Sequence, residues 1–157
     1  MKKTSQILIA MVLLLLLSNA FYGQTHTITL NVDTANLTND NVTSESITYF
    51  TAENTQVDVA SPPEDFEITV PNGATIIWEG VSSSSDEDTI EIFMIKWEKG
   101  PRIFSSDDIP GNGNGTANAV VNGQTPGEPY KYKILFKVNG TGRMYQIDPK
   151  IKIGPGN

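Results

Sequence analysis

Two stretches of the chain alternate between apolar and polar residues with a period of two. The first runs from Thr25 to Val32 and the second, longer one from Tyr130 to Val138. The positions on the apolar side are His26, Ile28, Leu30 and Val32 in the first stretch and Tyr130, Tyr132, Ile134, Phe136 and Val138 in the second. Because successive side chains of a strand point to opposite faces, this period predicts a half-buried strand in each stretch.

Shorter apolar runs, separated by turn residues, predict the other strands. We expect them at 47–50, 57–60, 66–70, 74–81, 90–97, 116–122 and 144–147, with a last one through Ile151 and Ile153. A Pro-Asn-Gly triplet at 71–73 tolerates the positive φ angles of a tight turn, so it predicts a hairpin between its two flanking strands. Residues 34–65 are mostly polar, and we expect this region to be loosely structured.

The run from Ile90 to Trp97 is apolar on both faces. Such a strand is covered on both sides, carries a β-bulge, or presents an aromatic face to a partner. In a regular strand, Phe93 and Trp97 share a face and stand roughly 13 Å apart. These two rings are a candidate platform for stacking against sugar rings, and the alternative is that they pack in the core.

The composition after residue 23 favours strands throughout. Ile, Val and Thr dominate, whereas only three leucines occur, Leu30, Leu37 and Leu135. β-Branched side chains lose rotamer freedom in a helix and pack well on a pleated surface. The chain is therefore predicted to be all-β, an antiparallel β-sandwich of about seven to nine short strands, cupredoxin-like or immunoglobulin-like.

The first 23 residues have the pattern of a secretory signal peptide. Lys2 and Lys3 precede an apolar run from Ile7 to Leu17, and small residues follow. The run is shorter than the roughly 20 residues that span a bilayer, so we expect cleavage, after Ala20 or Gly23, rather than membrane insertion. The predicted product is one domain, 24–157, exported to the periplasm or the extracellular space.

Charge and cysteine content exclude several functions. Loss of the two N-terminal lysines shifts the formal charge from -7 to -9, which argues against binding to nucleic acid or to an anionic membrane surface. The chain has no cysteine, and this excludes disulfides, thiolate nucleophiles and cysteine-ligated metals. Its single histidine, His26, stands near the start of the predicted domain.

Two acidic loops supply oxygen ligands of the kind that calcium prefers. Asp86 and Asp88 follow a run of four serines, and Asp107 and Asp108 lie in a second polar segment. Their spacing matches no calcium-loop pattern, so solvated acidic loops are the alternative. No other cofactor is expected.

The strand from Val70 to Trp78, with the sequence Val-Pro-Asn-Gly-Ala-Thr-Ile-Ile-Trp, is similar to the Val-x-x-Gly-x-x-Ile-x-Trp strand of cupredoxin-like domains. With the runs 130–138 and 145–151, the part of the chain from Phe66 to Ile153 resembles small exported bacterial β-sandwich proteins. A copper-binding cupredoxin would add two His, a Cys and usually a Met, of which only Met144 is present near the last hairpin. The resemblance therefore implies the shape without the copper site.

These patterns predict an exported, non-catalytic protein with a structural or adhesive role. A polysaccharide or a cell-surface protein would be its partner, and the sequence leaves the oligomeric state open. One alternative is a carbohydrate-binding module that uses Phe93 and Trp97. The other is a small hydrolase with two catalytic carboxylates, for which Glu79, Glu91 and Glu98 are the formal candidates.

Overall fold

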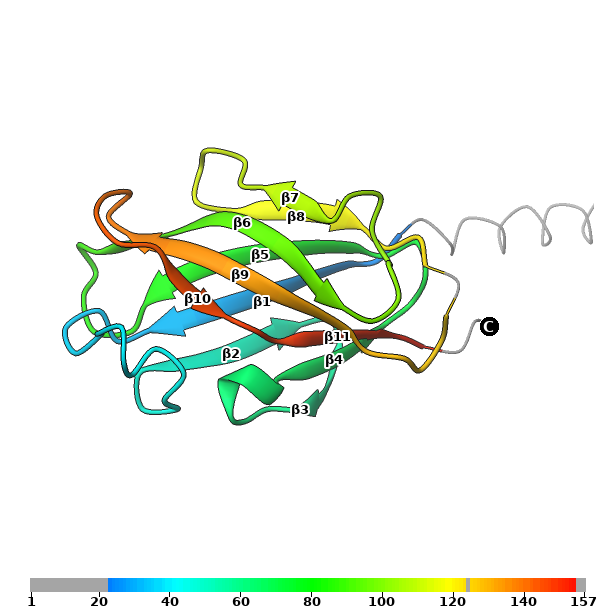
Figure 1. Ribbon diagram of the computed structural model, residues 1–157, viewed down its shortest axis with the longest axis horizontal. Coiled ribbons are helices and arrows are strands. Elements are labelled where there is room, and N and C mark those ends of the chain that lie inside the picture. The colour runs from blue at the N-terminus through cyan, green and yellow to red at the C-terminus, as the bar shows by residue number, and fades with distance from the viewer. Residues whose placement is uncertain (1–22, 124, 155–157) are drawn as a thin grey trace, which may run out of the picture.

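The computed structural model describes residues 23–123 and 125–154, and these residues form an all-β fold (Figure 1). The predicted class is confirmed. The strands are β1 (Thr25–Val32), β2 (Thr48–Glu53), β3 (Gln56–Val59), β4 (Glu67–Val70), β5 (Thr75–Ser82), β6 (Thr89–Lys99), β7 (Asp108–Pro110), β8 (Ala117–Val120), β9 (Tyr130–Val138), β10 (Tyr145–Ile147) and β11 (Lys150–Ile153). A short 3-10 helix, η2 (Pro63–Asp65), precedes β4. Apart from Gly23, the signal peptide expected at 1–23 falls outside the described residues.

The strands form one strongly curved sheet in the order β2-β1-β5-β6-β9-β11-β4-β3, with β7 beside β6, β8 beside β5 and β10 beside β9 (Figure 1). The described residues contain eleven strands rather than seven to nine. Nor is it wholly antiparallel, because β1 pairs with β5, and β11 with β4, in parallel. The two ends of the sheet, β2 and β3, follow each other along the chain through Asn54 and Thr55.

The hairpin predicted between 66–70 and 74–81 is wrong. The turn is present, with Gly73 at a φ of 85°, but β4 pairs with β3 and β11, whereas β5 pairs with β1, β6 and β8. Both strands bury alternate side chains in the same core, and among these are Ile68 and Val70 from β4 and Ile76 and Trp78 from β5. The turn therefore carries the chain from one side of the core to the other, instead of joining two neighbouring strands.

The two strongest strand predictions are confirmed. In β1 the buried positions alternate from His26 to Val32, and in β9 they alternate from Tyr130 to Phe136. Inside the sheet, four aromatic rings form a continuous group: Trp78, Phe104, Tyr130 and Tyr132. The region 34–65, expected to be loosely structured, contains β2 and β3, and Ile47 and Phe50 are buried in it.

Candidate functional site

A groove of about 750 Å³ opens at the end of the fold where β5 leads into β6. Its walls come from residues between 79 and 91, from the loop 113–116 before β8 and from the turn 139–140 after β9. β5 and β6 pair only at Gly80 with Ile90 and at Val81 with Thr89. Gly80 makes this close approach possible, because a Cβ there would overlap the Ile90 side chain.

Hydrogen-bond acceptors dominate the lining of the groove. The polar side chains are the carboxylates of Glu79, Asp86, Asp88 and Glu91, the amides of Asn114 and Asn139, and the hydroxyls of Ser82, Ser85, Thr89 and Thr116. The lining contains no Lys or Arg. Such a surface attracts cations and donors and repels anions.

Asp88 holds the walls of the groove together. Its carboxylate accepts a hydrogen bond of 2.7 Å from the Thr34 hydroxyl and another of 2.8 Å from the Asn139 amide. These two bonds, that from Asn139 first, hold the pKa of the Asp88 carboxyl below its usual value. Three segments far apart in the sequence are thereby fixed at one carboxylate.

The other groove carboxylates are less engaged. Glu79 accepts a hydrogen bond of 2.8 Å from the Thr29 hydroxyl, whereas the side chains of Asp86 and Glu91 have no hydrogen-bond or ion-pair partner among the described residues. Of the three carboxylates considered for a hydrolase, the structure brings Glu79 and Glu91 to the groove. Glu98 lies elsewhere and forms an ion pair of 3.2 Å with Lys131.

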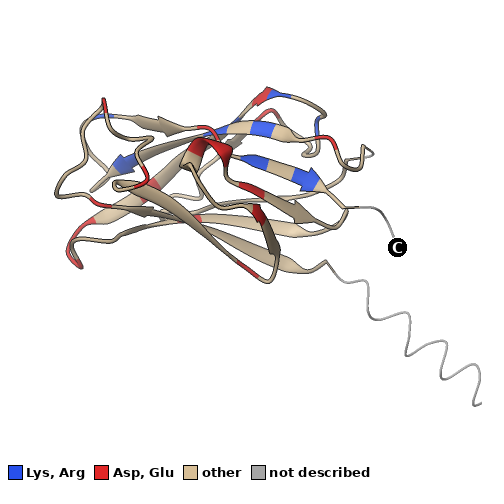
Figure 2. Ribbon diagram, turned by 90° about the horizontal axis from the view of Figure 1, so that it is seen from below, with Lys and Arg blue, Asp and Glu red and all other residues tan. Residues whose placement is uncertain are grey.

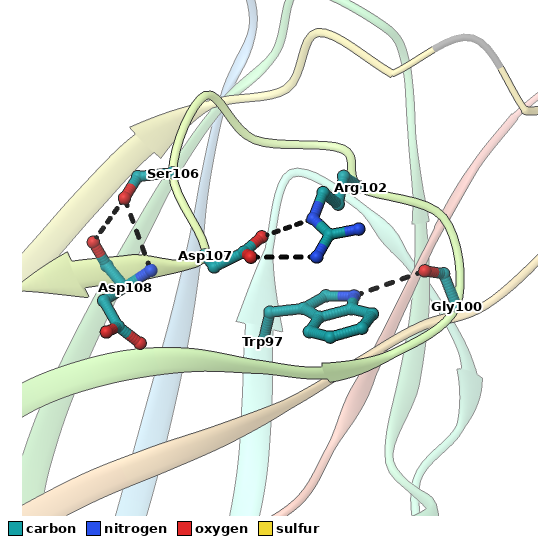
Figure 3. Close-up of polar contacts among 6 residues, drawn as sticks. All are labelled: Trp97, Gly100, Arg102, Ser106, Asp107 and Asp108. Carbon is teal, nitrogen blue, oxygen red and sulfur yellow. Dashed lines mark hydrogen bonds and ion pairs between the residues drawn. The ribbon is translucent and has the colours of Figure 1, made fainter.

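The four aspartates considered for calcium are divided between two places. Asp86 and Asp88 line the groove. Asp107 instead binds Arg102 through two hydrogen bonds of 2.7 and 3.0 Å, and Asp108 begins β7 (Figure 3). Among the described residues, no group of three or more His, Asp or Glu side chains is placed to hold a metal ion.

Phe93 and Trp97 do not share a face. The register between β6 and β9 shifts between Ile92 and Met94, which marks a β-bulge at Phe93. The extra residue reverses the parity of the strand, so Trp97 faces the same side as its buried partner Tyr132. Phe93 points outward and is 42% exposed. The bulge alternative is the one that the structure shows, and the paired platform is wrong.

Trp97 is covered on its outer side. The Arg102 guanidinium lies 4.2 Å from the ring centroid, held there by Asp107, and the indole nitrogen donates a hydrogen bond of 3.2 Å to the Gly100 carbonyl (Figure 3). The Trp97 backbone amide also donates to the Asp107 carbonyl at 2.7 Å. Trp97 thus anchors the loop between β6 and β7, a structural use of the ring.

Charge is divided along the chain and in space. In the described chain, every Lys and Arg lies between Lys96 and Lys152, whereas the charged residues from Gly23 to Ile95 are Asp and Glu only, apart from His26. Figure 2 shows the basic residues gathered on one side of the fold. Sequence reasoning missed this feature, although the order of charges along the chain already contains it.

Six lysines lie toward one end of the outer face of β6, β9 and β11, and we call this surface the lysine face: Lys96, Lys99, Lys131, Lys133, Lys150 and Lys152. Three of its cross-strand pairs bring like charges directly opposite each other: Lys96 with Lys133, Lys99 with Lys131, and Lys131 with Lys150. Directly opposed like charges destabilise a sheet. An acidic partner would relieve that repulsion.

Several acidic side chains offset part of this charge. Lys131 pairs with Glu98, Lys150 with Asp65 and Lys152 with Glu67. Lys96 and Lys99, both exposed, form no ion pair among the described residues. The face therefore keeps a net positive surface at the end of β6.

Two titratable side chains of the described core, His26 and Tyr130, are buried without a hydrogen-bond partner. His26 is 1% exposed, and neither ring nitrogen has a hydrogen-bond partner. Burial lowers the pKa of His26, and the nearby Asn54 backbone offsets part of this effect. Burial is also the main cause of the raised pKa of Tyr130, whose hydroxyl has no partner. Both lie outside the groove lining.

Comparison with known proteins identifies a shared fold and no family. No protein-family model matches the chain, and no curated protein matches it by sequence. Among solved structures, the inclusion body protein PixA of Burkholderia cenocepacia superimposes with a TM-score of 0.56 at 10% identity, over 84% of this chain and 96% of that one. Within the described residues, no helix has the length and apolar character needed to cross a membrane.

Proposed function

We propose that the chain is an exported, non-catalytic protein with a structural or adhesive role, and that the acidic groove is its contact site. The groove supports this role because its walls offer carboxylate, amide and hydroxyl groups and no cation. These groups suit a partner that carries amines and hydroxyls on a cell surface, such as an amine-bearing polysaccharide. The role requires no bound cofactor and involves neither nucleic acid nor membrane insertion.

We propose also that the sheet is a β-sandwich of the cupredoxin-like or immunoglobulin-like kind. Support comes from the point where β5 and β6 part, because β8 continues beside β5 and β7 continues beside β6. The strands then divide into two layers around the aromatic core. The similar solved structure is that of an inclusion body protein, which is consistent with a structural role for this chain.

Binding to insoluble polysaccharides tests the proposed role. Purified protein is mixed with neutral chitin, amine-bearing chitosan and acidic pectate at about 20 mM and about 500 mM NaCl. We expect retention on chitosan at low salt and release at high salt, because salt screens exposed charges. A variant with Asp86→Asn and Glu91→Gln should bind chitosan about tenfold more weakly.

A matched control carries the same charge change outside the groove, at the exposed residues Asp40 and Glu45 (Asp40→Asn with Glu45→Gln). This control should bind chitosan much more strongly than the groove variant. Equal loss in both variants, or no preference for the amine-bearing polymer, would contradict the groove as contact site. We do not propose the sugar platform, because Phe93 and Trp97 lie on opposite faces of β6. We do not propose the hydrolase either, because Glu79 accepts a hydrogen bond from Thr29 and no contact of the described residues pairs it with Glu91.

A further inference from the structure

The lysine face carries positive charge without an ion-pair partner among the described residues at the end of β6, at Lys96 and Lys99. Lys96 and Lys133 stand opposite each other, and Lys99 stands opposite Lys131. Glu98 is the carboxylate shared by Lys131 and Lys133, at 3.2 and 4.0 Å. Asp108 lies across from Lys96 on β7 but forms no ion pair with it. An anionic group placed over this end of β6 would therefore gain from two opposed lysine pairs at once.

The complementary surface lies on the same molecule, at the groove. Asp86 lines the groove and Glu87 is exposed beside it. Neither side chain forms a hydrogen bond or ion pair with another described residue. They stand on the loop between β5 and β6, which projects at the end of the fold (Figure 1). The acidic loop and the lysine face carry opposite charges, and both are exposed, so the loop of one molecule can contact the face of another.

We propose that the lysine face of one copy binds the acidic groove loop of a second copy of this chain. This inference rests on the proposed function, because it names a cationic partner for the same groove. Two lysine faces repel each other, and so do two acidic loops, so the contact is head-to-tail rather than symmetric. Each bound pair leaves one face and one loop free, and the assembly continues into open chains.

An apolar element lies beside the lysine face. Phe93 stands on the bulge of β6 with 42% of its surface exposed, and the Lys137 ammonium lies 5.1 Å from the ring centroid. Aromatic rings are enriched at the centres of interfaces, and charged groups lie mostly at their rims. Burial of Phe93 against the incoming loop would add an attraction that salt does not screen.

Sedimentation of the full chain and of two reciprocal variants tests the inference. The face variant carries Lys96→Glu with Lys99→Glu, and the loop variant carries Asp86→Lys with Glu87→Lys. For the wild type we expect an average mass that rises with concentration at about 20 mM NaCl and returns to that of the monomer at about 500 mM. Each variant alone should associate at least about tenfold more weakly.

An equimolar mixture of the two variants gives the decisive measurement. The reversed face of one should bind the reversed loop of the other, so the mixture should associate like the wild type. Two single charge reversals at exposed residues give a matched control. Arg143→Glu, in the turn before β10, should associate like the wild type. Lys96→Glu, on the lysine face, should associate more weakly than the wild type. Circular dichroism checks that every variant is folded.

A monomeric wild type at low salt, or a mixture that does not regain association, would overturn the inference. A monomeric wild type that is still retained on chitosan through Asp86 and Glu91 would leave the proposed function standing. Association that the face variant leaves intact would likewise overturn the lysine face as the contact. Failure of both experiments would remove the groove as a binding site.

Discussion

The indole nitrogen of Trp78 donates a hydrogen bond of 3.1 Å to the hydroxyl of Tyr132, and both side chains are fully buried. The two residues stand on β5 and β9, which are not neighbours in the sheet. Their rings meet edge to face at 5.8 Å. This bond ties β5 to β9 through the core and satisfies two polar atoms that water cannot reach.

Tyr132→Phe should therefore destabilise the protein without changing its fold. The substitution leaves the Trp78 indole N–H without a partner in the core, at a cost of about 1–3 kcal/mol. Urea denaturation measures this as a lower midpoint with an unchanged slope. Tyr49→Phe is the control, because Tyr49 is 45% exposed and lies outside the buried core. Equal midpoints for the two variants would contradict the role given to the bond.

His26 predicts a stability loss on mild acidification. Its pKa is lowered in the folded state, mainly by burial, so the unfolded chain binds the proton more tightly. The stability contributed by neutral His26 is full above the unfolded pKa of about 6.5 and is lost as the pH falls from there toward the lower folded value. Urea midpoints between about pH 7.5 and pH 5 should therefore decrease.

His26→Leu separates this effect from the carboxylates. The variant has no titrating group at this position, so its midpoint should stay nearly constant over the same pH range. Asp33, Asp65, Asp88 and Asp107 have lowered pKa values, and their contribution is lost only at more acidic pH. A variant as pH-sensitive as the wild type would show that another group is responsible.

Arg102→Ala should expose Trp97. The guanidinium covers one face of the indole, so its removal roughly doubles the ring surface open to a quencher. Acrylamide quenching reports on Trp97, because the other tryptophan, Trp78, is 0% exposed. The melting temperature should change little, since the Arg102–Asp107 ion pair is exposed. Unchanged quenching would show that the guanidinium does not cover the ring in solution.

Asp88→Ala should loosen the groove. The carboxylate binds both Thr34 and Asn139, so its loss frees the loop after β1 and the turn after β9. Hydrogen exchange should become faster at the amides of both segments. Asp86→Ala removes a neighbouring carboxylate without such bonds and should leave exchange there unchanged. Equal exchange in the two variants would argue against Asp88 as the tie.

Calcium should have little effect on stability. Asp86 and Asp88 are separated from Asp107 and Asp108, and Asp88 and Asp107 already accept hydrogen bonds from protein side chains. Melting temperatures in about 1 mM CaCl2 and in excess chelator should agree to within measurement error. A clearly higher melting temperature in calcium would contradict this expectation and would support a cation site in the loop around Asp86.

The alternation of β1 and β9 could be predicted because one face of each strand is buried and the other is solvated. Which strands pair with each other could not be predicted from the same pattern. The turn at 71–73 has the residues of a hairpin turn, yet β4 and β5 pair with different strands. Both strands bury side chains in the same core. Local turn signals fix a change of direction, whereas strand pairing is decided by tertiary contacts.

The site was harder to predict for the same reason. Glu79 and Glu91 were recognisable as carboxylates, but their meeting at the groove depends on where β5 and β6 part. For Phe93 and Trp97, a single extra residue in β6 reversed the parity. A period-two pattern remains apolar on both sides of a bulge, so the sequence allowed this alternative without selecting it.

The positions of β1 and β11 impose an order on folding. These are the first and last described strands, and both lie inside the sheet, β1 between β2 and β5 and β11 between β9 and β4. Until Lys150–Ile153 has left the ribosome, β9 and β4 have no bridge between them, and each presents a bare edge to other chains. Closure thus waits for the synthesis of β11, and a product that lacks this strand would be prone to aggregate instead of forming a smaller stable fold.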